Sequence, residues 1–396
     1  MLETPENAGA PDRTCQNRCV QLFIDDEIFH RHRRGGVSRY LCELAQAAGR
    51  QPDARVVLFG GWCQSQVIRT VRPGSNVAVV FRPRDMKLRL NGLAWALSTV
   101  WRRRCFADAL KRDPATIYHP GLYAYDPWIA RRAAGLVVTV HDMQLEIQGT
   151  RSRSTQRQVR EKAAACKVAD RIFCVSENTR RDLEQRVPAA VGRTTVVHLG
   201  SSLPFPKTPN AGALRRNYFL MVGGRHGHKN GRVALQAFAA IAAEDPSIRL
   251  RMCGGEPPGS EGELDFAGGD RVRDRIDWVQ PDDAALADAY AGAVALLYPS
   301  NYEGFGLPVL EAMCCGCPVI TTAVSSLPEV GGEAALYIQP GDGTALAVHM
   351  RRLLADPAFF SSRVELGRQQ AARFSWEATA GTVVSACRRI APAPAR

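Results

Sequence analysis

The sequence has no run of apolar residues long enough to cross a membrane and no composition typical of a disordered chain. No stretch approaches the roughly 20 apolar residues that span a bilayer, although 45% of the 396 residues are hydrophobic. With 23% charged residues, the composition is that of a globular protein. Because the chain is too long for one ordinary hydrophobic core, we expect two domains of about 200 residues each.

Cysteine is too scarce for a disulfide scaffold. The twelve cysteines are spread over 396 residues, far below the density of a short disulfide-rich protein. Cys314, Cys315 and Cys317 cluster without a nearby histidine, so packed, reduced thiols are favoured over a zinc site. The first twenty residues lack the charged-then-apolar order of a secretory signal. We therefore expect a flexible tail over residues 1–19, on a cytoplasmic protein in a reducing compartment.

Two nucleotide-binding fingerprints are missing. No G-x-G-x-x-G and no G-x-x-x-x-G-K-[ST] follows any expected strand, which disfavours a nicotinamide or flavin dehydrogenase and a P-loop kinase. No internal repeat of 20 to 50 residues is visible, which argues against a solenoid or a propeller.

The excess of positive charge is confined to the first half of the chain. Residues 1–200 contain 32 Lys and Arg against 19 Asp and Glu, whereas residues 201–396 contain 19 against 20. A basic half suits nucleic acid, an anionic membrane or an anionic substrate, and charge alone does not choose among them. No helix-turn-helix, zinc finger or RNP motif is present, so we expect no nucleic-acid partner.

Short apolar runs alternate with amphipathic stretches along nearly the whole chain, which is typical of βα units around parallel sheets. The expected strands form two series: 20–25, 56–59, 77–80, 116–118, 136–140, 171–175 and 195–198, then 219–222, 250–252, 276–279, 293–298, 319–321 and 334–338. Prolines at 204, 206 and 209 separate the series and suit a stiff linker. We expect two doubly wound α/β domains, over 20–202 and 211–375, and a last helix over 376–390 that packs back on the first.

The motif SNYEGFGLPVLE, residues 300–311, directly follows an expected buried strand. Gly304 and Gly306 allow close approach of backbone N–H groups to a ligand, and Pro308 suits a first helical turn. Glu303 then lies in a loop and Glu311 about one turn into a short helix, so both carboxylates can reach one ligand. Carboxylates accept from sugar hydroxyls and a helix N-terminus favours a diphosphate, so the motif suits a sugar nucleotide. The alternative is two surface glutamates beside a glycine turn.

A second motif, GGRHGHKN at 223–230, follows the first strand of the second series. Arg225 and Lys229 place two cations at a junction of strand and helix, where the backbone N–H groups around Gly224 are also available. This arrangement suits a diphosphate clamp that stabilises charge on a leaving nucleoside diphosphate. A solvated basic turn is the alternative. We interpret His226 and His228 as bystanders.

Three further segments end or follow strands of the first series. One strand ends in His141 and Asp142, where a histidine is more often structural than catalytic. The segment RGGVSRY at 34–40 puts Gly35 and Gly36 at the start of a long helix, which fits a diphosphate, an acceptor or a plain loop. Ser176 lies at a strand end, and we predict that it caps the next helix.

Together these motifs resemble the retaining glycosyltransferases of family 4, and most closely their bacterial mannosyltransferase-like members. The resemblance covers residues 20–390 and implies the GT-B fold, in which two Rossmann-like domains face a central cleft. It implies that Glu311 binds the ribose hydroxyls and Glu303 the donor sugar, while His141 contacts this sugar near the reacting carbon. The implied binding residues for the nucleotide sugar are Gly35, Gly36, Asp142, Gly224, Arg225, Lys229, Gly304, Phe305, Gly306, Leu307 and Glu311.

The resemblance also implies an activity and its partners. The expected reaction is metal-independent transfer of a hexose, mannose foremost, from a nucleoside diphosphate sugar with retention of configuration. GDP-mannose is one candidate donor, and we expect no cofactor. The expected acceptor is a lipid-linked or growing saccharide of surface polysaccharide synthesis. The segment WVQP at 278–281 carries no glycine where relatives commonly do, so the base stays open. A catalytically silent scaffold subunit of a polysaccharide assembly complex is the alternative function.

The basic excess includes one tryptophan-bearing segment, residues 82–104, with seven Lys or Arg against one Asp. Such a segment suits a helix lying on an anionic membrane. It suits equally a helix whose apolar side is core. The first interpretation predicts a peripheral protein at the inner face of the plasma membrane.

Overall fold

The computed structural model describes residues 19–31, 35–63, 65–83, 91–149, 152–203, 217–224, 227–255 and 272–390. These residues form two sheets. The first contains β1 (Val20–Ile24), β2 (Ala54–Cys63), β3 (Val77–Pro83), β4 (Ile117–His119), β5 (Gly135–Val140), β6 (Arg171–Cys174) and β7 (Thr194–Val196), and the second β8 (Tyr218–Val222), β9 (Arg249–Cys253), β10 (Ile276–Val279), β11 (Leu296–Tyr298), β12 (Val319–Thr322) and β13 (Leu336–Ile338). Every predicted strand overlaps one of them.

Helices alternate with these strands. Those of the first series are α1 (Glu27–Arg31), α2 (Gly36–Gly49), α3 (Asn91–Arg112), α4 (Pro127–Ala130), α5 (Gln144–Gln148), α6 (Arg153–Val168) and α7 (Glu177–Arg186). Those that follow are α8 (Gly231–Glu244), α10 (Asp283–Gly292), α11 (Leu307–Cys314), α12 (Leu327–Gly331), α13 (Gly343–Ala355), α14 (Pro357–Ala371) and α15 (Trp376–Ile390).

The two sheets share one topology. The strand order is β3-β2-β1-β4-β5-β6-β7 in the first and β10-β9-β8-β11-β12-β13 in the second. In both, the first strand of the series lies in the middle and the chain later reverses direction across the sheet, which defines a doubly wound fold. The pairs around each reversal, β1 with β4 and β8 with β11, are parallel. The predicted fold class is confirmed.

The chain divides into two compact units, whose limits differ from those of the sheets. One unit consists of Met1–Val138, Glu161–Ile172 and Ala380–Arg396. The other consists of Thr139–Arg160 and Phe173–Thr379, so it includes the loop that follows β5 as well as the whole second sheet. The predicted linker at 204–210 lies outside the described residues, and the predicted domain limits stay a prediction.

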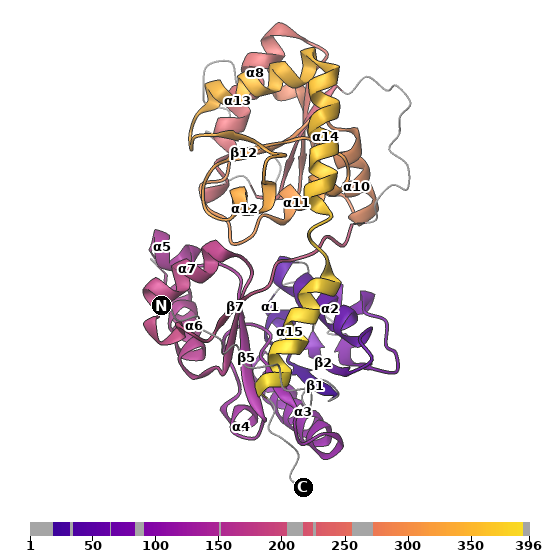
Figure 1. Ribbon diagram of the computed structural model, residues 1–396, viewed down its shortest axis with the longest axis vertical. Helices are drawn as coiled ribbons and strands as arrows, with labels where there is room; N and C mark the ends of the chain where they lie inside the picture. Colours follow the sequence, from indigo (N-terminus) through magenta and orange to yellow (C-terminus); the bar gives the residue numbers. More distant parts are fainter. Residues whose placement is uncertain are drawn as a thin grey trace, which may run out of the picture. The chain divides into compact units, whose positions relative to one another are not determined.

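The second sheet is covered by helices on both faces. On one face α8 and α13 pack together and contribute Phe238, Ile241, Leu346 and Met350 to the core. Figure 1 shows α10, α11 and α14 on the opposite side of the strands. Burial of both faces explains why these strands read as continuous apolar runs in the sequence.

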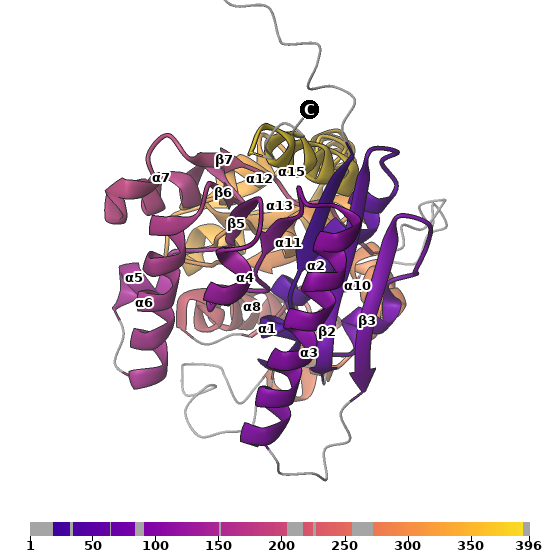
Figure 2. The same ribbon diagram turned by 90° about the horizontal axis from the view of Figure 1, so that it is seen from below.

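In the first compact unit, α2 and α3 both pack against β2 (Figure 2). The Trp101 ring of α3 lies edge-on to Phe59 of β2, with ring centroids 5.1 Å apart. The amphipathic helix α15 buries Val383, Val384 and Cys387. An ion pair between Arg388 and Asp53 adds a polar contact within this unit.

The basic segment at 82–104 is partly engaged inside the first unit. Arg102 contacts Asp26 at 2.7 Å and Arg103 contacts Asp126 at 2.9 Å, and both carboxylates are buried. These arginines therefore neutralise buried carboxylates of the first unit. Leu97 and Val100 of the same helix are exposed. The side chains of residues 82–95 lie outside the described part. Among the described residues, no helix is long and apolar enough to cross a membrane.

Candidate active site

Two loops come together where the strand order of the second sheet reverses. β8 and β11 are neighbours, and they pair through Leu220 and Leu296. Ligands of doubly wound sheets bind beyond the carboxyl ends of the strands at such a reversal. The chain that leaves β8 carries Lys229, and the chain that leaves β11 carries Glu303. Both sequence motifs of the second half therefore lie at the edge where a ligand is expected.

The Glu303 carboxylate is fixed by partners from two loops. Its Oε1 lies 2.6 Å from Lys229 Nζ and accepts a hydrogen bond of 2.6 Å from Ser300 Oγ. The backbone N–H of Glu303 donates to Ser325 Oγ at 2.9 Å. Because the carboxylate side chain is only 12% exposed, this ion pair is shielded from water and stronger than a surface pair.

Tyr298, the last residue of β11, lies beneath this ion pair. Its hydroxyl contacts Lys229, whose ammonium lies 4.7 Å from the ring centroid. Burial, and then the negative charges of Glu303 and Glu311, raise the pKa of Tyr298 well above its ordinary value, so the phenol stays neutral. Glu311 itself accepts a 3.0 Å hydrogen bond from Tyr290. Both carboxylates of the motif thus lie near one buried phenol.

Gly304 brings the Glu303 loop against the end of β5. A Cβ atom placed on Gly304 would lie 1.7 Å from the carbonyl oxygen of His141 and 3.0 Å from Cβ of Asp142. No larger residue fits there without moving one of the two segments. The structure therefore places the backbone of His141 next to Glu303, although the two residues are 162 positions apart, and both belong to the second compact unit.

Two hydroxyl groups hold the same loop from the other side. Ser176 Oγ donates to the carbonyl oxygen of Gly304 at 2.7 Å, and Thr179 Oγ1 donates to it at 3.0 Å. Ser176 also caps α7 by accepting from the Thr179 N–H, so the predicted helix cap is confirmed. Its additional bond to Gly304 was not predicted.

The remaining residues of the motif shape the start of α11. Gly306 has a φ of 103° and forms the N-cap, a conformation that favours glycine. The Phe305 ring is buried against His198 and Phe374, so only its backbone is available to a ligand. Leu307 is the first helical residue. The N-terminus of α11 thus begins three residues after Gly304.

Comparisons with known proteins identify the family. The model "Glycosyl transferases group 1" matches residues 207–373, and the model "Glycosyltransferase Family 4" matches residues 34–203. The O-antigen chain mannosyltransferase B of Escherichia coli is 30% identical over 365 residues, which cover 86% of this chain and 93% of the relative. The chain belongs to glycosyltransferase family 4.

Solved structures of low identity share the fold of this glycosyltransferase. A sucrose-phosphate synthase from Thermosynechococcus elongatus matches with a TM-score of 0.71 at 22% identity, covering 94% of this chain and 99% of that one. Anabaena HepE in complex with UDP and glucose matches with a TM-score of 0.67 at 17% identity, covering 92% and 98%. The predicted family and GT-B fold are confirmed.

Several predicted site residues of the glycosyltransferase stay predictions. Arg225 lies outside the described residues, and Gly224 beside it is exposed. Gly35 and Gly36 begin α2 in the first compact unit. Asp142 accepts from the backbone N–H of Gln144 at 3.0 Å, which fixes the turn after β5.

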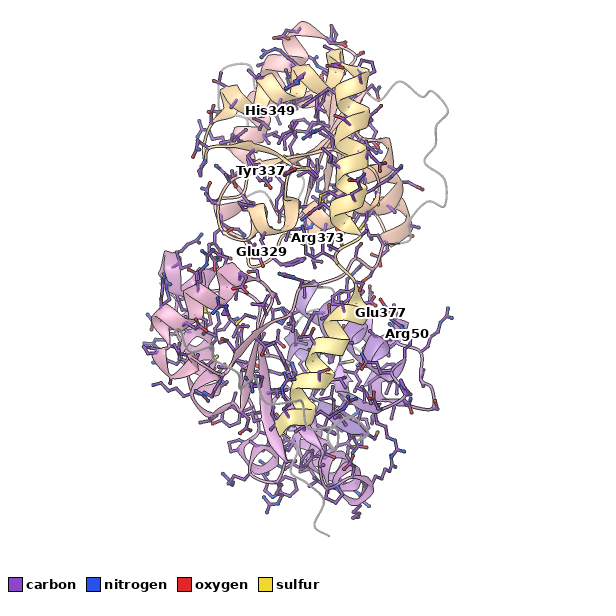
Figure 3. The ribbon with its side chains drawn as sticks, viewed as in Figure 1. Arg50, Glu329, Tyr337, His349, Arg373 and Glu377 are labelled. Carbon is purple, nitrogen blue, oxygen red and sulfur yellow. The ribbon has the colours of Figure 1, made fainter. Side chains whose placement is uncertain are left out.

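Glu329 of α12, labelled in Figure 3, was not singled out from the sequence. Its carboxylate accepts from the backbone N–H groups of Glu177 and Asn178, the first residues of α7, and lies 2.6 Å from His198 Nε2. Burial would raise the pKa of Glu329, but His198 and these amides outweigh it and lower the pKa. A carboxylate at a helix N-terminus also stabilises the helix dipole. No sequence signal marks this contact, because its partners lie about 130 to 150 positions away.

His228 was interpreted as a bystander, and the structure places its side chain next to Glu303. Its Nδ1 lies 2.7 Å from Gln144 Nε2, and its Nε2 lies 3.9 Å from Glu303 Oε1. The side chain is therefore part of the cluster around Glu303. Its position next to Lys229 in the sequence was the available signal.

Proposed function

We propose that this glycosyltransferase transfers a hexose, mannose foremost, from a nucleoside diphosphate sugar to a saccharide acceptor with retention of configuration. The observation that carries the proposal is the shielded Lys229–Glu303 pair above Tyr298, at the strand reversal of the second sheet. A cation for the diphosphate and a carboxylate for sugar hydroxyls are thus adjacent. Similarity to an O-antigen chain mannosyltransferase over most of the chain supports mannose as the transferred sugar and GDP-mannose as the donor.

The proposed reaction needs no metal ion and no cofactor. Lys229, together with Arg225 and the N-terminus of α11, supplies positive charge for the departing diphosphate. The bond between the anomeric carbon and the phosphate oxygen breaks, and the acceptor oxygen bonds to the same face of the sugar. The acceptor proton passes to the departing phosphate. In this scheme Glu303 binds the donor sugar, Glu311 the ribose, and His141 lies near the reacting carbon.

The proposed acceptor is a lipid-linked or growing saccharide of surface polysaccharide synthesis. The name of the Escherichia coli relative refers to O-antigen chains, and WaaG, whose fold matches with a TM-score of 0.64, is a glycosyltransferase of lipopolysaccharide biosynthesis. A lipid-linked acceptor would place the enzyme in the cytoplasm at the inner face of the plasma membrane. The exposed Leu97 and Val100 of α3, in a basic segment, fit such contact.

A nucleotide-sugar screen tests the donor. At a concentration of about 100 Kd, a donor stabilises the folded protein enough to raise Tm on the order of 5 °C. We expect GDP-mannose to give a larger rise than UDP-glucose, and GDP a larger rise than UDP. Transfer of labelled mannose to an acceptor extract then separates an enzyme from a silent scaffold subunit. Binding of no nucleotide sugar, or no transfer from any of them, would contradict the proposal.

A vesicle assay tests the membrane contact. We expect sedimentation with vesicles containing anionic lipid, weakened by salt because the attraction is between charges. Replacing Leu97 and Val100 by serine should reduce binding several-fold, since these side chains would lose their insertion into the interface. The matched control replaces Val348 of α13, which is also exposed. Binding that is indifferent to anionic lipid and to salt would refute membrane contact.

A further inference from the structure

The imidazole of His228 lies between two loops of the candidate site. His228 belongs to the short 3-10 turn Gly227–Lys229 that follows β8. Its carbonyl oxygen accepts from the backbone N–H of Asn301 at 2.7 Å and lies 3.2 Å from Ser300 Oγ. The backbone of His228 is therefore fixed to the loop that carries Glu303.

Gln144 determines which ring nitrogen carries the proton. Gln144 Nε2 lies 2.7 Å from Nδ1 of His228 and 3.2 Å from Oε1 of Gln148. An amide nitrogen has two hydrogens and no lone pair for hydrogen bonding, so it donates to both atoms. With the amide in this orientation Nδ1 is the acceptor, which places the proton of the neutral ring on Nε2.

The Nε2–H group faces the cluster where the sugar nucleotide is expected. Nε2 lies 3.9 Å from Glu303 Oε1, too far for a hydrogen bond. In the described part of the chain this N–H has no acceptor at hydrogen-bond distance. A ligand oxygen that replaces water beside Glu303 and Lys229 would come within reach of it.

Burial of the imidazole favours the neutral ring. Burial, as the largest cause, lowers the pKa of His228, and the adjacent Lys229 lowers it further, while Glu303 and Asp142 act in the opposite direction. At neutral pH the ring is therefore a neutral donor that adds no charge next to Lys229.

We propose that His228 donates a hydrogen bond from Nε2 to an oxygen of the bound nucleotide sugar, and that Gln144 is the positioning residue that fixes the required tautomer. This inference rests on the proposed function, since the ligand is the sugar nucleotide itself. The contact between Gln144 and His228 joins two segments that are far apart in sequence, the start of α5 and the loop after β8. Both segments lie within the second compact unit. The proposed hydrogen bond adds a neutral donor beside the charged side chains of Lys229 and Glu303.

Two substitutions distinguish the role of Nδ1 from the role of Nε2 in His228. In His228→Gln the amide nitrogen can reach the position of Nε2, whereas in His228→Asn the side chain reaches only the position of Nδ1. The asparagine keeps an acceptor for Gln144 but lacks the donor toward the ligand. We expect KM for GDP-mannose to rise about tenfold in the asparagine variant and less than about threefold in the glutamine variant. Equal effects of both variants on KM would overturn the proposal.

A third variant tests the role of Gln144. Gln144→Met has a similar length and no donor, so the ring should populate both tautomers and KM should rise a few-fold with kcat little changed. The ¹⁵N chemical shifts of the imidazole report the tautomer directly, assigned by the signal lost in His228→Asn. We expect an unprotonated Nδ1 in the wild type at pH 7 and a mixture in Gln144→Met. An Nδ1–H tautomer or a charged ring in the wild type would overturn the assignment.

These measurements distinguish failure of this inference from failure of the proposed function. If the wild type binds and turns over GDP-mannose while the two His228 variants behave alike, only the role of His228 is wrong. If the wild type binds no nucleotide sugar, the proposed function fails, and the role of His228 as a donor to that ligand fails with it.

Discussion

Replacing Glu303 by glutamine should reduce transferase activity by about 10²- to 10³-fold, the usual cost of losing one electrostatic contact to the reacting groups. Glutamine has the same shape, but it carries no negative charge to pair with Lys229 or to accept strongly from sugar hydroxyls. The charge of Lys229 would then no longer be neutralised by a carboxylate, which changes its attraction for the phosphates of the donor. Transfer of labelled hexose from a nucleotide sugar measures the effect.

The fold of this variant should survive, because the glutamine oxygen can still accept from Lys229 and from Ser300 at the observed distances of 2.6 Å. Tm should change by no more than a few degrees. The control is Glu244→Gln, since Glu244 pairs with Arg351 at the exposed surface and should leave activity within about twofold. Turnover near the wild-type rate in Glu303→Gln would remove Glu303 from the site.

Replacing Gly304 by alanine should disrupt both activity and stability. The added methyl group would lie 1.7 Å from the carbonyl oxygen of His141, a distance that forces the loop or the end of β5 to move. Such overpacking typically costs about 1–3 kcal/mol, which corresponds to a fall in Tm of several degrees. A displacement near 1 Å at reacting groups can cost about 10²-fold in rate, so we expect a loss of that size.

Gly74→Ala is the matched control, because a Cβ atom there meets nothing within 4 Å. Its Tm and activity should equal those of the wild type. Ser176→Ala probes the same loop more gently, because Thr179 still donates to the Gly304 carbonyl. If Gly304→Ala had wild-type stability and activity, the close packing of His141 against the Glu303 loop would be refuted.

The strands could be predicted from the sequence because they are buried on both faces of the sheet. Runs such as residues 136–138 are apolar throughout because each side of a parallel sheet is covered by helices. Their alternation with helical stretches, together with the prolines of the linker, was enough to predict two doubly wound sheets. The starts of helices were also predictable where local chemistry decides them, as with Ser176 before α7 and Pro308 in the first turn of α11.

Contacts between distant loops could not be predicted from the sequence, since they depend on how the strands are ordered and packed. Gln144 and His228 are 84 positions apart, and Glu329 contacts a helix that begins 152 positions earlier. Each of these residues belongs to a type common on protein surfaces. Their roles follow only once both segments occupy the same part of the second compact unit.

The sequence by itself therefore determined the two sheets and the strand ends at which Lys229 and Glu303 lie, because local periodicity and turn chemistry specify these features. The family followed from the resemblance of its motifs to a known family. Tertiary structure alone decided that Gly304 packs on His141, that Tyr298 lies beneath the ion pair and that His228 lies beside Glu303. These arrangements arise from backbone and side-chain contacts across more than 60 residues of chain, and no local pattern encodes such contacts.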